Sequence, residues 1–165
     1  MKSEIELRKL MKKKRYLDHY IQGFADAEGC FSVALKKQKS ARFGWVLDPL
    51  FQVTQHKNNS VVLELIKKTL GCGRIIEKPG QKDTLIYLVD NRRQLREKII
   101  PFFKRHQLIV KKLDFELFTR IVDGLEEKRH SKPETFKELI EIAFRMNMNG
   151  KQRRYNIGDV MGDIK

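Results

Sequence analysis

The hydrophobic positions along the chain change their spacing several times, and each change marks a new element of structure. Residues 16–28 carry apolar side chains at helical spacing, and Gly29 follows them as a helix stop signal. The spacing then drops to two in "CFSVALKKQK", residues 30–39. This alternation predicts a strand that points Phe31 and Val33 toward the core.

A partner strand and another helix come next. The segment "WVLDPLFQVTQHK", residues 45–57, alternates again, and Phe51 and Val53 are predicted to face the core. The segment "NNSVVLELIKKTLG", residues 58–71, returns to helical spacing and is closed by Gly71.

The same order of elements then repeats. Residues 73–90 read as a hairpin that turns at Pro79-Gly80. Residues 91–100 read as a helix that stops at Pro101, because proline removes a helical hydrogen bond.

Two further helices with apolar stripes are expected at residues 111–127 and 133–148, before a basic tail that we expect to be ordered only on a partner. The whole order is an α+β plan, with helices gathered on one face of an antiparallel sheet. No long linker divides the chain, so a single domain, residues 1–165, is predicted. Its core covers about residues 16–125, and C-terminal helices and the basic tail occupy residues 126–165.

Charge narrows the choice of partner. Thirty-five Lys and Arg residues against 21 Asp and Glu residues give a formal net charge of +14, which favours a polyanionic partner. No apolar run approaches a membrane span, and the first 15 residues are too charged for a signal peptide, so membrane and secreted classes are disfavoured. The isolated Cys30 and Cys72 and the scattered histidines indicate no zinc site and no histidine-centred nuclease. Nucleic acid is therefore the expected partner.

The polar face of the predicted sheet carries side chains that suit DNA. Lys and Arg can reach guanine edges or phosphates, and Gln can bond adenine. The alternative interpretation is an ordinary solvated sheet face. The candidate contact residues are Ser32, Lys36, Gln38, Arg42, Gln52, Arg74, Lys78 and Lys82, with Arg153 and Arg154 in the tail as candidate phosphate contacts.

The segment "YIQGFADAEG" resembles the signature helix of the LAGLIDADG homing endonucleases, with residues 21–29 at its nine positions. The stretches "FQVTQ", "IIPFF" and "LIVKKLDFELF" resemble other typical segments of that family in the same order. The resemblance covers about residues 16–125 and implies an αββαββα core. It also implies a site-specific endonuclease that makes double-strand breaks in a long pseudo-palindromic DNA target, across the minor groove and with 3′ overhangs. The implied biological role is intron mobility.

The resemblance also implies a homodimer, because only one signature is present. Gly23 and Ala27 lie on one helical face and lack bulk, so a second helix can approach closely there. Tyr20 and Phe24 complete the expected dimer interface. The alternative is that these small residues contact the protein's own sheet.

The two acids of the signature raise a physical question, because carboxylates are unfavourable at the negative end of a helix. A divalent cation would make them tolerable, and the resemblance implies Mg²⁺ held at Glu28 and Ala27. Mn²⁺ is an alternative, and Ca²⁺ is expected to occupy the site without supporting cleavage. Asp26 is expected to be structural, by capping or by holding a neighbouring loop.

The remaining catalytic roles also follow from the resemblance. Gln55 is expected to position solvent, and Lys111 to stabilise charge on the phosphate, with Lys112 and His106 as alternatives. Some relatives have a basic residue where this chain has Asn59. The candidate substitutes are His56 and Lys57.

Two other functions remain open from the sequence. One is an RNA-binding splicing maturase that binds intron RNA, and the other is a DNA-binding regulator on the same fold without catalysis. The expected location is an organelle that encodes the gene, either chloroplast or mitochondrion, or a prokaryotic cytoplasm.

Overall fold

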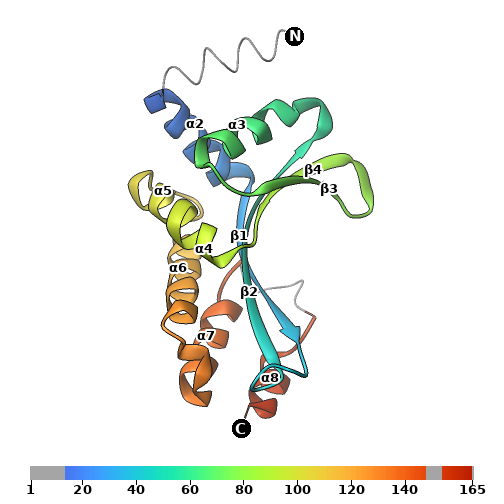
Figure 1. Ribbon diagram of the computed structural model, residues 1–165, viewed down its shortest axis with the longest axis vertical. Helices are drawn as coiled ribbons and strands as arrows, with labels where there is room; N and C mark the ends of the chain where they lie inside the picture. The colour runs from blue at the N-terminus through green and yellow to red at the C-terminus, as the bar shows by residue number, and fades with distance from the viewer. Residues whose placement is uncertain (1–13, 148–153, 165) are drawn as a thin grey trace. The chain divides into compact units, whose positions relative to one another are not determined.

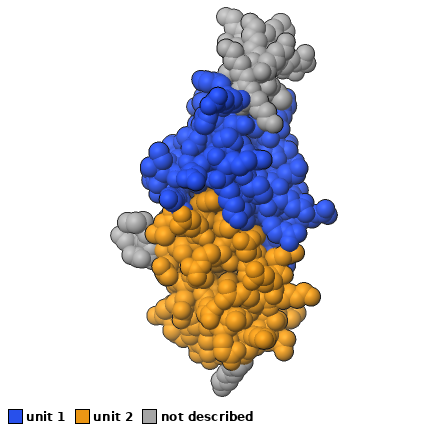
Figure 2. Space-filling model, turned by 90° about the vertical axis from the view of Figure 1, so that its left-hand side faces the viewer, with its two compact units in different colours: residues 1–30, 51–112 blue, residues 31–50, 113–165 orange. Residues whose placement is uncertain are grey.

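The structure is a computed structural model that describes residues 14–147 and 154–164. Contacts divide the chain into two compact units, coloured separately in Figure 2. Unit 1 comprises residues 1–30 and 51–112, and unit 2 comprises residues 31–50 and 113–165. Both units are discontinuous in sequence. The single domain remains a prediction.

The order of elements confirms the α+β fold class and the αββαββα core (Figure 1). The elements are α2 (Lys14–Glu28), β1 (Gly29–Lys37), β2 (Trp45–His56), η1 (Lys57–Asn59), α3 (Ser60–Leu70), β3 (Arg74–Lys78), β4 (Gln81–Val89), α4 (Arg92–Gln94), η2 (Leu95–Ile99), α5 (Ile100–Arg105), α6 (Lys112–Glu126), η3 (Arg129–Ser131), α7 (Pro133–Phe144) and α8 (Ile157–Asp163). The strands form one four-stranded antiparallel sheet in the order β1-β2-β4-β3.

Unit 1 is built on the antiparallel pairing of β4 with both β2 and β3. The Phe51 ring packs edge-on against Tyr87 at 6.2 Å and against Phe103 at 5.4 Å between ring centroids. All three side chains are fully buried, and the Tyr87 hydroxyl donates to the carbonyl of Cys72 at 3.1 Å. Burial of this hydroxyl raises the pKa of Tyr87. The predicted alternation in β2, which places Phe51 and Val53 in the core, is confirmed.

Unit 2 has its own aromatic core. Phe31 packs between Phe115 and Phe118, with ring centroids 5.2 and 5.4 Å away. A separate contact joins the Trp45 indole N–H to a carboxylate oxygen of Asp163 at 3.1 Å. Phe31 and Phe118 are almost completely buried, so the apolar stripe predicted for α6 faces the core of unit 2.

The helix predicted to stop at Pro101 instead continues to Arg105, so that prediction is wrong. Residues Leu95–Ile99 form a π-helix, in which the N–H of Ile100 donates to the carbonyl of Leu95. Pro101 then lies in the first turn of α5, where its missing N–H costs little. The wider π turn thus lets the chain stay helical through a proline.

The C-terminal region also differs from its prediction. Helix α7 ends at Phe144, before the expected end at residue 148, and α8 lies in the tail that was expected to be ordered only on a partner. The Asn156 side chain caps α8 by accepting the N–H of Gly158, and Val160 is completely buried. Burial of one apolar side chain and the Trp45 bond therefore order a helix that is too short to be recognised by periodicity.

Two glycines with nearly the same positive φ allow a test of packing in unit 1. Gly73 has φ +77°, and an added Cβ would lie 2.7 Å from both Tyr87 and Val89 side-chain atoms and 2.8 Å from the Leu88 carbonyl oxygen. Gly80 has φ +76°, and an added Cβ would meet nothing within 4 Å.

We expect Gly80→Ala to lower the free energy of unfolding by about 1 kcal/mol, from backbone strain alone. Gly73→Ala should cost about 1–3 kcal/mol more, because its methyl group overlaps packed atoms. Urea unfolding of both variants measures the difference. Equal losses would show that the Gly73 environment relaxes freely.

Candidate functional site

Helix α2 has one buried face and one exposed face. Ile21 and Ala25 are completely buried, whereas Gly23 and Ala27 are exposed. A Cβ added at Gly23 would meet nothing within 4 Å. In the described part of the chain, the small residues therefore do not pack against the protein's own sheet. Tyr20, also exposed, stacks on Phe24 with ring centroids 5.9 Å apart.

The junction between α2 and β1 is tight. An added Cβ at Gly29 would lie 2.5 Å from the carbonyl oxygen of Ala25. Only glycine therefore allows the helix to end in Glu28 and the strand to start in the next residue.

The carboxylate of Asp26 is used entirely inside unit 1. One oxygen accepts the backbone N–H groups of Ile109 and Val110 at 3.0 Å each, and the other accepts that of Lys111 at 2.9 Å. Partial burial alone would raise the pKa of Asp26, but these three donors and the Lys111 charge outweigh it and hold the pKa below the ordinary value. The prediction that Asp26 is structural and holds a neighbouring loop is confirmed.

Glu28 lies in a different environment. Its side chain is exposed, and within residues 14–147 and 154–164 its carboxylate has no hydrogen bond and no ion pair. One acid of the signature thus serves the fold, while the other is available to a ligand.

Lys111 reaches the end of α2 directly. Its ammonium group donates to the carbonyl of Asp26 at 2.9 Å and to that of Ala27 at 3.1 Å. Carbonyls at the C-terminus of a helix lack helical partners and carry partial negative charge, so an ammonium group stabilises them. Lys111 therefore compensates the accumulation of negative charge that the sequence places there.

The two alternatives to Lys111 lie in other environments. Lys112 is exposed and starts α6. The His106 ring lies 3.7 Å from the Asp18 carboxylate and packs against Phe102 with ring centroids 4.7 Å apart. Of the three candidates, Lys111 is the one whose side chain bonds the residues next to Glu28.

Gln55 and its neighbours form a local hydrogen-bond group at the end of β2. The Gln55 side-chain oxygen accepts the N–H of His56 at 2.9 Å and faces the Asn59 amide at 3.5 Å. His56 in turn accepts the N–H of Asn58 at 3.2 Å, and Lys57 forms an ion pair with Asp83. The two candidate substitutes for the missing basic residue are therefore engaged in local contacts.

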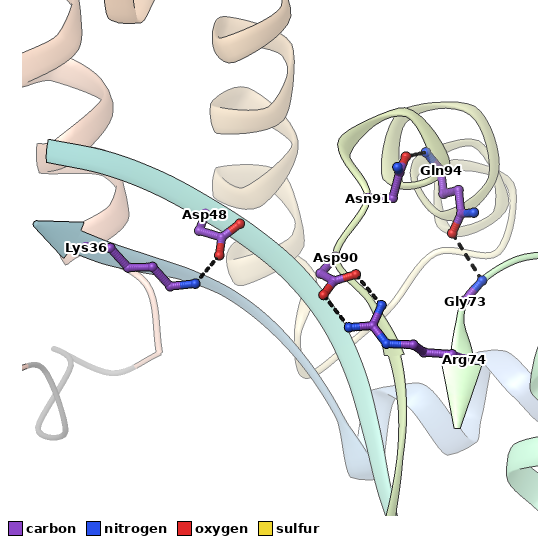
Figure 3. Close-up of polar contacts among 7 residues, drawn as sticks. All are labelled: Lys36, Asp48, Gly73, Arg74, Asp90, Asn91 and Gln94. Atoms are coloured by element: carbon purple, nitrogen blue, oxygen red, sulfur yellow. Dashed lines mark hydrogen bonds and ion pairs between the residues drawn. The ribbon is translucent and has the colours of Figure 1, made fainter. Parts of the chain in front are cut away.

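Two predicted DNA contacts, Lys36 and Arg74, are exposed cations that pair with acids. In unit 1, Arg74 makes two hydrogen bonds of 2.6 Å to the Asp90 carboxylate, and these bonds raise the pKa of Arg74. In unit 2, Lys36 on β1 forms an ion pair with Asp48 on β2 (Figure 3). Asp48 and Asp90 were not predicted from the sequence. The alternation of β2 could have indicated Asp48, because it shares the outward face with Gln52.

The other predicted contact residues differ in exposure. Gln38, Arg42, Lys82 and Arg154 are exposed, Ser32, Gln52 and Lys78 are partly buried, and Arg153 lies outside the described residues. The Gln38 amide donates to the Ser40 hydroxyl at 3.1 Å.

A single chain offers few metal ligands. The described residues contain no group of three or more His, Cys, Asp or Glu side chains that could hold a metal ion. At the end of α2 the oxygen donors are the Glu28 carboxylate and main-chain carbonyls, which suit a hard divalent cation but leave most of its ligands to other molecules. In the same described residues, no helix is both long and apolar enough to cross a membrane.

Comparisons with known proteins identify the family to which this fold and the signature helix belong. Residues 21–122 match the family described as LAGLIDADG endonuclease. Homing endonuclease I-ApeII of Aeropyrum pernix is 36% identical over 141 residues, which are 84% of this chain and 83% of that protein.

Two solved structures share the fold. The archaeal intron-encoded homing endonuclease I-Vdi141I complexed with DNA has a TM-score of 0.85 and 40% identity, over 91% of this chain and 95% of that chain. The I-LtrWI LAGLIDADG homing endonuclease bound to target DNA has a TM-score of 0.79 and 33% identity, over 84% of this chain but only 47% of that chain.

The fold, the acid at the end of α2 and these matches define a site-specific homing endonuclease that acts on double-stranded DNA. The chain belongs to the LAGLIDADG endonuclease family. The predicted fold class, family and function are confirmed. Enzymes of this family generally depend on a divalent metal.

The role of Asp26 leads to a prediction about stability. Asp26→Asn should lower the free energy of unfolding at pH 7 by about 1–3 kcal/mol, because the amide keeps only one of the two acceptor oxygens and cannot satisfy all three backbone donors. The pKa of Asp26 is lower in the folded than in the unfolded chain, so its contribution is complete above the ordinary value of 3.8. The contribution is lost as the pH falls through the folded-state pKa.

Chemical denaturation at several pH values measures this effect. Glu28→Gln is the matched control, since its exposed carboxylate should contribute less than about 0.5 kcal/mol. A difference between wild type and Asp26→Asn that persists unchanged at low pH would contradict the assignment.

Proposed function

We propose that two copies of this chain form a Mg²⁺-dependent endonuclease that hydrolyses one phosphodiester on each strand of a long, pseudo-palindromic DNA target. The observation that carries the proposal is the contrast between the two acids of the signature. Asp26 is saturated by backbone donors, whereas Glu28 is exposed and has no partner in the described part of the chain.

The donors at the end of α2 fit the protein's share of a Mg²⁺ site. Glu28 would contribute its carboxylate and Ala27 its main-chain carbonyl, while water and phosphate oxygens would complete the six ligands. When bound, Mg²⁺ supplies a polarised water and neutralises phosphate charge. Mn²⁺ fits the same donors, and Ca²⁺ would bind them without supporting cleavage.

Two other residues, Gln55 and Lys111, would orient solvent and stabilise charge on the phosphate. Gln55 lies at the end of β2 with an amide that can hydrogen-bond solvent. The Lys111 ammonium group would stabilise negative charge on the phosphate.

A second copy is needed because each chain carries one signature helix and one exposed signature acid. Tyr20, Gly23 and Ala27 leave an exposed face on α2, and Phe24 stacks beside them. This chain covers 47% of the I-LtrWI chain. The longer I-LtrWI chain thus has room for a second unit of this size, which here would come from a second copy. A dimer would carry twice +14, or +28, and its two-fold axis would match a two-fold DNA site.

Side chains on the strands and their connecting loops would recognise the DNA target. The residues that would reach bases or phosphates are the exposed Lys36, Gln38, Arg42, Arg74 and Lys82 and the partly buried Ser32, Gln52 and Lys78. Arg153 and Arg154 would add phosphate contacts that weaken as salt rises. The proposed setting is an intron of an organellar or prokaryotic genome, where the enzyme promotes mobility of that intron.

Cleavage selection tests the proposed chemistry. Wild type and Glu28→Gln are each incubated with Mg²⁺ and a randomised library of long, near-palindromic duplexes, and the cut products are sequenced. We expect wild type to cut specific sequences and leave 3′ overhangs. Glu28→Gln should bind the same sequences but cleave them at least a hundredfold more slowly, which is on the order of the rate lost when one catalytic interaction is removed.

Other outcomes would redirect the proposal. Specific binding by wild type without cuts would indicate a DNA-binding regulator. Failure to select any DNA, together with binding to structured intron RNA, would indicate a maturase.

The exposed face of α2 gives a test of dimerisation. Gly23→Leu should fold normally, because nothing in the described chain lies within 4 Å of the added Cβ. Its side chain would keep two α2 helices apart, so we expect a monomer at concentrations where wild type is a dimer. Sedimentation velocity measures this.

Gly162→Leu is the matched control, since Gly162 in α8 is also exposed and also has open space around an added Cβ. It should remain a dimer. A dimeric Gly23→Leu variant would place the interface elsewhere.

A further inference from the structure

The carbonyl oxygen of Ala27 has two competing roles. It is one of the two oxygens proposed to hold Mg²⁺, yet it already accepts a hydrogen bond from the Lys111 ammonium group at 3.1 Å. The same ammonium group lies 2.9 Å from the carbonyl of Asp26. A positive charge of the chain itself therefore occupies the end of α2.

This ammonium group is held in place by a closed ring of contacts. The Asp26 carboxylate accepts the backbone N–H of Lys111 at 2.9 Å, and the Lys111 side chain returns to the backbone carbonyl of Asp26. The bonds to Ile109 and Val110 fix the preceding turn as well. The main chain of Lys111 is thus anchored independently of its side chain.

Two cations cannot share this carbonyl without cost. A carbonyl oxygen has two lone pairs, but an ammonium group and a divalent cation on the same oxygen would repel each other at very short range. Lys111 has a flexible four-carbon stem, so its charge can move while its backbone stays anchored.

We propose that Lys111 is a built-in cation that occupies the metal-binding carbonyl of Ala27 and is displaced from it when the divalent metal binds. The inference rests on the proposed metal site. Without metal, Lys111 neutralises the carbonyl end of α2. With metal, its ammonium group is released while Asp26 still tethers its backbone, so it becomes available to a phosphate beside the site. Metal binding and phosphate contact by Lys111 are then coupled, and the coupling is reciprocal.

Metal affinity tests the displacement without any measurement of cleavage. Mn²⁺ binding to the full chain is measured by electron paramagnetic resonance for wild type, Lys111→Met and Lys112→Met. Lys112→Met is the matched control, because it removes the same charge from an adjacent, exposed residue. We expect Lys111→Met to bind Mn²⁺ about five- to tenfold more tightly than wild type, and Lys112→Met to differ by less than about twofold. Equal effects of the two substitutions would overturn the proposal.

A second measurement uses the wild-type chain and therefore does not depend on how a variant folds. Reductive methylation with mass spectrometry gives the modification rates of Lys111 and Lys112 with and without Ca²⁺. We expect Ca²⁺ to accelerate modification of Lys111 several-fold and to leave Lys112 unchanged. An unchanged or slower rate at Lys111, at Ca²⁺ concentrations that saturate the site, would overturn the proposal.

Glu28→Gln separates this inference from the function on which it rests. Loss of Mn²⁺ binding in Glu28→Gln, with no tightening in Lys111→Met, would leave the metal site in place and refute the displacement alone. Unchanged Mn²⁺ binding in Glu28→Gln would refute the proposed metal site, and the displacement with it.

Discussion

The carboxylate of Asp26 organises the part of the molecule where the proposed chemistry takes place. It joins the last turn of α2 to a loop 85 positions later in the chain, through three backbone donors. That loop brings Lys111 to the carbonyl end of the helix, where its charge opposes the helix dipole. The arrangement leaves Glu28 as the signature acid that is exposed to solvent. A structural acid and the acid proposed to hold the metal thus lie two residues apart, in different surroundings.

Helix α2 has a buried face that serves folding and an exposed face that is proposed to bind a second copy. Ile21 and Ala25 are completely buried and tie the helix to unit 1. The opposite face exposes Gly23 and Ala27, and nothing within the described chain constrains the space beyond Gly23. A helix with one small-residue face left open is suited to a close helix partner. The described residues of one chain contain no group of three or more His, Cys, Asp or Glu side chains that could hold a metal, so the proposed Mg²⁺ site would take further ligands from other molecules.

Features that depend on local pattern could be predicted from the sequence, and features that depend on distant contacts could not. Alternation correctly placed Phe51 in the core, and Gly71 ends α3 in the left-handed conformation as expected. The prediction that the helix stops at Pro101 was wrong, because the energetic cost of proline applies inside an α-helix and not after the π turn that precedes it here. Helix α8 depends on the burial of Val160 and on the bond from Trp45, which lies 118 positions before Asp163.

The candidate site shows the same division. The resemblance to the family distinguished Glu28 from Asp26, and the backbone bonds then gave the physical reason for the role of Asp26. The pairing of Lys36 with Asp48 and of Arg74 with Asp90 depends on contacts between separate segments, which no single segment reveals. These partners have a consequence for how the enzyme searches a genome. A chain with a net charge of +14 would adhere to any duplex, but Arg74 and Lys36 already have carboxylate partners in Asp90 and Asp48. If Arg74 and Lys36 contact DNA as proposed, a passing sequence would have to offer them better acceptors than these acids. Random DNA would then be released quickly, and residence time would be concentrated on the correct site.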